Sequence, residues 1–201
     1  MIRKLLIISA IIVSGCTTLP PSDVSDICAI FTEKDDWYGA ADDARDRWGS
    51  PIPVMMAIMY QESRFQAKAK PPRKKILWVI PGPRPSSSYG YTQALTETWA
   101  VYKRNAGNYG ADRDDFGDSI DFIGWYNHQS YKKSGIKKDD PYHLYLAYHE
   151  GHGGFNRRSY KNKQWLKAVS KKVSRQSAGY TRQLNTCEEK LKDDGWFFGL
   201  F

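Results

Sequence analysis

Apolar residues recur every three or four positions along most of this 201-residue chain, which predicts a mainly helical protein. The helical patterns cover residues 26–48, which split into two pieces, and then 53–65, 92–102, 119–129, 142–150 and 163–191. Pro51 and Pro53 open the second region, where the first turn of a helix does not need their missing N–H. No internal repeat interrupts the pattern, so we expect one helical domain.

Residues 53–65 carry a polar residue in an apolar setting. Four apolar residues share one face of the predicted helix: Met55, Ile58, Met59 and Phe65. Glu62 falls on the same stripe. Desolvation there would raise the pKa of the carboxyl and keep it protonated near neutral pH, ready to donate a proton. A buried glutamate satisfied by an arginine or by helix-start amides fits the pattern equally well.

A long connection follows, over residues 68–88, where proline, lysine, arginine, glycine and serine surround one apolar island at 76–80. Connections of this length inside compact domains are usually functional or disordered. We expect it to form one wall of a cleft. Its five basic residues are interpreted as a solvated loop: Lys68, Lys70, Arg73, Lys74 and Lys75.

The chain begins with features of an export signal. Arg3 and Lys4 precede an apolar run at 5–13, and small residues lead into Cys16. This run is too short for a permanent membrane helix, which needs about 20 residues. The segment resembles a bacterial lipoprotein signal, which implies a lipid anchor on Cys16. Thr17 comes next, at the position where lipoproteins held at the inner membrane of diderm bacteria usually carry aspartate. The resemblance therefore favours the periplasmic face of the outer membrane over the inner membrane.

The predicted organisation is therefore a signal peptide at 1–15, a tether at 16–25 and a folded domain at 26–201. Loss of Arg3 and Lys4 with the signal lowers the formal net charge from +8 to +6. A basic exported protein meets cell-wall strands with their peptide carboxylates, whereas no nucleic-acid-binding module is recognisable. Cys28 and Cys187 are a candidate disulfide in an oxidising compartment, although two unpaired buried thiols remain the alternative.

Three short segments occur in a meaningful order. They are Tyr-Gln-Glu-Ser-Arg-Phe at 60–65, Ser-Tyr-Gly-Tyr-Thr-Gln-Ala at 88–94 and Ala-Tyr-His-Glu-Gly-His-Gly-Gly at 147–154. They resemble the Glu-Ser, Gly-Leu-Met-Gln and Ala-Tyr-Asn-x-Gly motifs of the soluble lytic transglycosylase domain, which shares its fold with goose-type lysozyme. The resemblance covers roughly residues 50–180 and implies a lysozyme-like domain with a long loop insertion near the cleft.

The resemblance also implies roles for individual residues. Glu62 matches the catalytic acid, and Tyr148 matches a tyrosine whose hydroxyl faces that carboxyl. The expected substrate-binding residues are Ser63, Gly90, Tyr91, Gln93, Tyr148, His149 and Tyr180. Tyr91 and His149 depart from the family's usual leucine and asparagine. Other aromatics, among them Tyr89 and Tyr126, are weak candidates for stacking on sugars, whereas we expect Trp99 and Trp125 in the core.

The implied reaction needs a single carboxyl. Glu62 would protonate the bridging oxygen of the MurNAc-GlcNAc β-1,4 bond and then take the proton of the C6 hydroxyl, giving a 1,6-anhydroMurNAc end. A lysozyme-like hydrolase is one alternative and needs a second carboxylate, for which Asp118 and Asp121 stay open. A catalytically silent, murein-binding lipoprotein that tethers an envelope complex is another.

Two nearby histidines, His149 and His152, raise the question of a metal site. The two histidines are three positions apart rather than the four of zinc proteases, and no third ligand is evident. Gly151, Gly153 and Gly154 instead predict a tight turn after the helix. We expect neither a metal nor another cofactor.

Overall fold

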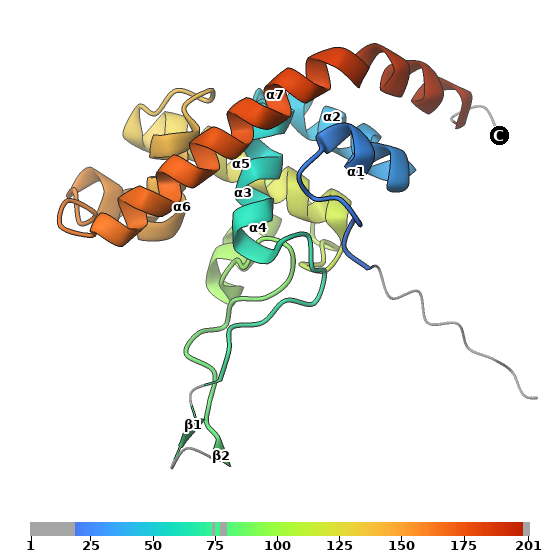
Figure 1. Ribbon diagram of the computed structural model, residues 1–201. Helices are drawn as coiled ribbons and strands as arrows, with labels where there is room; N and C mark the ends of the chain where they lie inside the picture. Colours follow the sequence, from blue (N-terminus) through green and yellow to red (C-terminus); the bar gives the residue numbers. More distant parts are fainter. Residues whose placement is uncertain (1–18, 74, 77–79, 199–201) are drawn as a thin grey trace, which may run out of the picture.

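The computed structural model describes residues 19–73, 75–76 and 80–198 of the chain (Figure 1). Its helices are α1 (Ile27–Glu33), α2 (Asp35–Trp48), α3 (Ile52–Ser63), α4 (Thr96–Ala106), α5 (Phe116–Ser134), α6 (Pro141–Asn156) and α7 (Gln164–Phe198). Strands β1 (Lys75–Ile76) and β2 (Ile80–Pro81) form a small antiparallel hairpin. The prediction of a mainly helical chain is confirmed.

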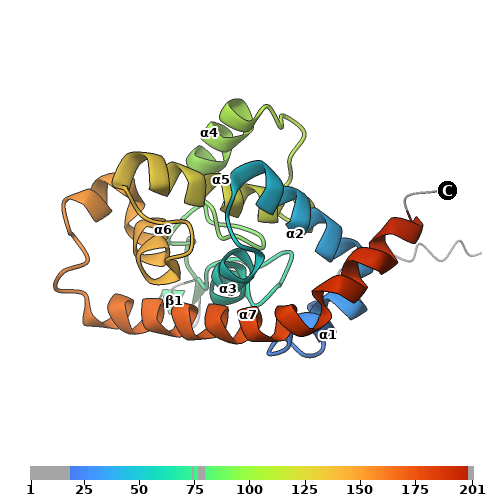
Figure 2. The same cartoon turned by 90° about the horizontal axis from the view of Figure 1, so that it is seen from above.

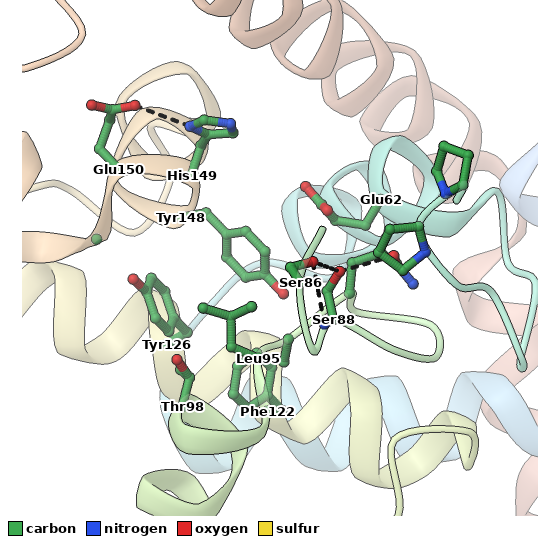
Figure 3. A pocket seen from close by; sticks show the side chains of 15 residues that line it. Glu62, Ser86, Ser88, Leu95, Thr98, Phe122, Tyr126, Tyr148, His149 and Glu150 are labelled. Atoms are coloured by element: carbon green, nitrogen blue, oxygen red, sulfur yellow. Dashed lines mark hydrogen bonds and ion pairs between the residues drawn. The ribbon is translucent and has the colours of Figure 1, made fainter. Parts of the chain in front are cut away.

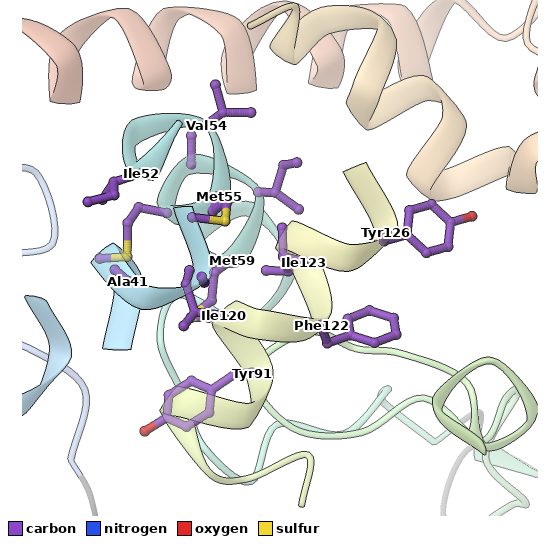
Figure 4. Close-up of a cluster of buried hydrophobic side chains, with 14 of the residues drawn as sticks. Ala41, Ile52, Val54, Met55, Met59, Tyr91, Ile120, Phe122, Ile123 and Tyr126 are labelled. Carbon is purple, nitrogen blue, oxygen red and sulfur yellow. The ribbon is translucent and has the colours of Figure 1, made fainter. Parts of the chain in front are cut away.

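Helix α3 is the central element of the fold. It packs against α2, α5, α6 and α7, and Figure 2 shows it between α5 and α7. Every residue from Ile52 to Met59 is buried, with Met55 and Met59 facing Ile120 and Ile123 of α5 (Figure 4). The predicted single apolar face was therefore too narrow, because this helix is surrounded by protein on all sides.

Side chains at the helix ends explain where several helices begin and stop. Asp26, Asp115 and Asp140 accept hydrogen bonds from the first-turn amides of α1, α5 and α6. Glycines in the left-handed conformation end α2, α4 and α5. Within α6, Gly151 has φ 70°, so the helix kinks there and then continues to Asn156 instead of ending in the predicted turn.

The last helix holds the start of the domain. Cys28 in α1 and Cys187 in α7 form a disulfide across a sequence separation of 159 residues, as predicted. The Tyr180 hydroxyl donates to the Val24 carbonyl at 2.5 Å, and the Gln183 amide donates to the Ser25 carbonyl at 3.1 Å. Residues 24–28 are thus fixed along α7. The predicted signal peptide and Cys16 lie outside the described residues.

The predicted long connection over 68–88 extends away from the helices, with β1 and β2 at its far end (Figure 1). Its two ends return to the body next to the end of α3 and the loop before α4. In the part of the chain that the structure describes, no helix has the length and apolar character needed to cross a bilayer.

Candidate active site

A cavity of about 620 Å³ opens where the end of α3 meets α5, α6 and the two ends of the 68–88 connection (Figure 3). Four residues expected at the site line it: Glu62, Gln93, Tyr148 and His149. Further contributions come from the connection, through Pro71, Pro72, Ser86 and Ser88, and from Phe122 and Tyr126 of α5. The three sequence motifs, far apart along the chain, therefore meet around one pocket.

Glu62 reaches this pocket because α3 ends directly after it. Arg64 and Phe65 both take left-handed conformations, with φ of 52° and 60°. Such conformations are strained for residues with a side chain, and burial of the whole Phe65 ring in the core offsets the cost. The chain therefore turns away sharply, and the last turn of an otherwise buried helix is left facing the cavity.

The surroundings of Glu62 favour its protonated form. Burial raises the pKa of Glu62 to about 7, and a hydrogen bond from the Tyr145 hydroxyl opposes this increase. The partial negative charge at the carboxyl end of α3 acts in the same direction as burial. No lysine or arginine among the described residues forms an ion pair with this carboxyl. The alternative of a glutamate neutralised by an arginine is therefore not what the structure contains.

The family resemblance predicted that the Tyr148 hydroxyl faces the Glu62 carboxyl, but another tyrosine of α6 forms the hydrogen bond to it. The Tyr148 hydroxyl donates to the backbone carbonyl of Thr92 at 2.8 Å, which ties α6 to the loop before α4. The hydroxyl that hydrogen-bonds Glu62 belongs to Tyr145, one turn earlier and almost fully buried. Tyr145 was not predicted from the sequence, although its spacing of three from Tyr148 puts both on one helix face.

The loop that carries Gly90 and Gln93 is shaped by close backbone contacts. Gly90 has φ 76°, and a Cβ at this position would lie 1.9 Å from the Arg113 carbonyl oxygen. The Gln93 side-chain amide donates to the carbonyls of Ala69 at 3.0 Å and Gly90 at 2.9 Å. Gln93 thus lines the cavity while holding the connection in place, whereas Gly90, which was also expected to bind substrate, does not line it. The left-handed backbone of Gln93, with φ 50°, also explains why α4 starts at Thr96 rather than at the predicted residue 92.

Three further expected substrate-binding residues lie elsewhere, so that with Gly90 four of the seven do not line the cavity. The Tyr91 ring is 1% exposed and packs in the core against Trp37 and Phe116. Tyr180 is fully buried and holds the Val24 backbone. The Ser63 hydroxyl is buried and donates to the Met59 carbonyl of its own helix at 3.3 Å. We correct these three assignments: an adjacent motif position or an aromatic ring does not by itself put a side chain into the cleft. Trp99 and Trp125 are core residues, as expected.

A second carboxylate, Glu150, lines the cavity and was not anticipated. Its side chain is only 4% exposed, and it accepts hydrogen bonds from Lys163 at 2.8 and 3.0 Å, from Ser159 and from His149. These partners outweigh desolvation and lower the pKa of Glu150 to about 2. Figure 3 shows Glu150 and Glu62 on opposite sides of the pocket, with Tyr148 between them.

The two aspartates left open as partners of Glu62 have structural contacts. Asp118 accepts hydrogen bonds from the Asp112 amide and the Asn108 side chain, both at 2.8 Å. Asp121 accepts from Trp48 Nε1 at 2.6 Å and from the Tyr102 hydroxyl at 2.7 Å. Neither residue lines the cavity. They hold α5 to its neighbours.

The histidines of α6 also have partners other than a metal. His149 Nδ1 lies 3.0 Å from Glu150, and His152 Nε2 lies 3.0 Å from the Ser130 hydroxyl. The His152 ring stacks on Tyr126. Among the residues with described positions, no group of three potential ligands is arranged to hold a metal ion.

Comparison with known proteins identifies the family. The family described as the transglycosylase SLT domain matches residues 4–187, which is most of the chain. None of the curated proteins compared matches it. The helical architecture agrees with the lysozyme-like fold of that domain. The chain belongs to the transglycosylase SLT domain family.

Proposed function

We propose that this protein is a lytic transglycosylase that cleaves the MurNAc-GlcNAc β-1,4 bond of peptidoglycan without water, with Glu62 as general acid and then base. Membership of the family supports transglycosylase activity on peptidoglycan in general. The observation that carries the finer proposal is the environment of Glu62. Its carboxyl has a pKa of about 7, lines an open cavity and forms no ion pair with a lysine or arginine of the described chain.

A carboxyl with this pKa suits both halves of the reaction, because it exchanges its proton easily near neutral pH. Protonated Glu62 donates its proton to the bridging oxygen, and the bond from that oxygen to C1 of MurNAc breaks. The Glu62 carboxylate then accepts the proton of the MurNAc C6 hydroxyl while O6 bonds to C1. The products are a free GlcNAc 4-hydroxyl and a 1,6-anhydroMurNAc end, and Glu62 regains its proton.

Hydrolysis by a lysozyme-like route is the second candidate, and Glu150 is the reason to test it. Such enzymes use a second carboxylate as nucleophile or as base for water. Glu150 is poorly suited to either role, because Lys163, Ser159 and His149 already occupy its oxygens and lower its pKa to about 2. A carboxylate with so low a pKa binds a proton only weakly at neutral pH, so it is a poor general base.

Digestion of purified murein tests the proposal, with mass spectrometry used to identify the new ends. Anhydro ends from wild type and from Glu150→Gln, and none from Glu62→Gln, are the expected outcome. Reducing ends that disappear in Glu150→Gln would support hydrolysis instead. Equal products from wild type and Glu62→Gln would overturn the assignment of Glu62, and no product from wild type would support a silent binding protein.

We further propose that Cys16 carries a lipid anchor that holds the domain at the periplasmic face of the outer membrane. The arrangement of Arg3, Lys4 and the apolar run before Cys16 supports this, and the family is consistent with a place in the cell envelope. Replacement of Cys16 by serine should move the protein from the membrane fraction to the soluble periplasmic fraction. An unchanged distribution would contradict the anchor.

A further inference from the structure

A second cavity, of about 360 Å³, lies beside the catalytic cavity. Its lining residues are Lys70, Arg84, Ser86, Ser87, Ser88, Tyr89 and Arg113. Ser86 and Ser88 line both cavities, and Figure 3 shows them reaching the middle of the catalytic pocket. The two cavities therefore meet at Ser86 and Ser88, which together are called the serine ridge.

Three cations surround this second cavity. The Lys70 ammonium and the Arg113 guanidinium lie 5.2 and 5.3 Å from the centre of the same Tyr89 ring. Backbone carbonyls hold the arginines: Arg113 donates to Ser87 and Ala94, both at 2.9 Å, and Arg84 donates to Pro71 at 2.6 Å. The cationic groups are thus positioned before any ligand arrives.

The positive charge of these side chains is largely unneutralised. Within the described residues, none of the three cations forms an ion pair. One acid beside this cluster, Asp114, accepts a hydrogen bond from the Tyr89 hydroxyl at 3.0 Å. Guanidinium and ammonium groups beside serine hydroxyls are the donors that a carboxylate prefers.

We infer that this second cavity binds a carboxylate of the peptide attached to muramic acid while the glycan strand lies in the catalytic cavity. The inference rests on the proposed function for the position of the glycan. A strand beside Glu62 would carry its peptides within reach of the serine ridge, and the cations beyond the ridge select an acidic substituent. Strands that bear peptides therefore bind more tightly than strands without them.

Binding of two matched murein fragments tests this, one with its peptide and one without, measured by calorimetry on full-length Glu62→Gln protein so that no fragment is cleaved. We expect the protein to prefer the peptide-bearing fragment. In a Lys70→Gln/Arg84→Gln background that preference falls about fivefold, the scale of two solvent-accessible ion pairs. Arg113 stays unchanged because it makes two hydrogen bonds that support the loop before α4, whereas Arg84 makes one.

Arg104→Gln is the matched control, since this exposed cation of α4 lines neither cavity, and it keeps the preference. A fragment whose peptide carboxyls are amidated should bind no more tightly than the fragment without a peptide, because the cations recognise the negative charge. No preference in the parent protein, or the same preference in the double variant, would overturn the inference. Absence of anhydro ends in the murein digestion would instead reject the proposed function and leave this binding result interpretable.

Discussion

Glu62 links stability to pH because its charged form is poorly solvated in the folded protein. Its pKa is about 7 in the fold, against an ordinary value of 4.5. A raised folded-state pKa stabilises the fold at pH below the ordinary value, and this stabilisation is lost as the pH rises through about 7.

We therefore expect Glu62→Gln to be more stable than wild type at pH 8, by up to about 3 kcal/mol, and close to it at pH 4. Glutamine has similar volume and never ionises, so the difference reports the cost of the charge. Denaturant titrations of both proteins at the two pH values measure it. A difference that does not change with pH would mean that burial does not raise the pKa of Glu62.

Tyr145 sets the other side of this balance, because its hydroxyl stabilises the Glu62 carboxylate. In Tyr145→Phe the pKa of Glu62 should rise further, and the alkaline limb of the activity profile should move up by about one pH unit. Tyr142→Phe, on the same helix but outside the cavity, is the control. A lower rate with an unmoved limb would reduce Tyr145 to a packing role.

The residues of the site were only partly predictable. The order of the three motifs was sufficient to identify Glu62, Gln93, Tyr148 and His149, which meet at one cavity. Tyr145 and Glu150 depend on which face of α6 the kinked helix presents to the cavity, and this is a tertiary property. Tyr91 was misassigned, because an aromatic side chain beside a motif glycine packs into the core as readily as into a cleft.

At the scale of elements, the loop before α4 depends on a close backbone approach at Gly90. Gly90→Ala would combine a strained φ of 76° with a Cβ only 1.9 Å from a carbonyl oxygen, so backbone must move. We expect a loss of about 3 kcal/mol or more. Gly107→Ala isolates the conformational cost, because φ there is 72° and nothing lies within 4 Å. It should lose about 1 kcal/mol. Equal losses in urea denaturation would contradict the close approach.

Periodicity predicted the helices better than their ends. The two pieces of 26–48, the central helix and the long last helix all formed, since a repeat of three to four apolar positions needs only local information. The ends near residues 65 and 92 were wrong, because left-handed residues at Arg64 and Gln93 interrupt the backbone there. The end near residue 151 was wrong because the helix continues after the kink at Gly151. Only Gly151 among them is a residue type that signals such a conformation.

For the molecule as a whole, the Cys28–Cys187 disulfide closes nearly the entire domain into one loop. Cross-linking a loop of this length restricts the unfolded chain, with a stabilisation of about 2–5 kcal/mol. Cys28→Ser/Cys187→Ser should therefore melt at a lower temperature than wild type, and a reductant should lower the melting temperature of wild type alone. A reductant effect of equal size in both would show that the bridge contributes nothing.

The central claim is that Glu62 alone performs the acid and base steps and that the C6 hydroxyl takes the place of water. Mass spectrometry of murein digested by wild type and by Glu62→Gln tests it most directly. We predict 1,6-anhydroMurNAc ends from wild type and none from Glu62→Gln. Reducing MurNAc ends from wild type, or anhydro ends from the Glu62→Gln variant, would contradict it.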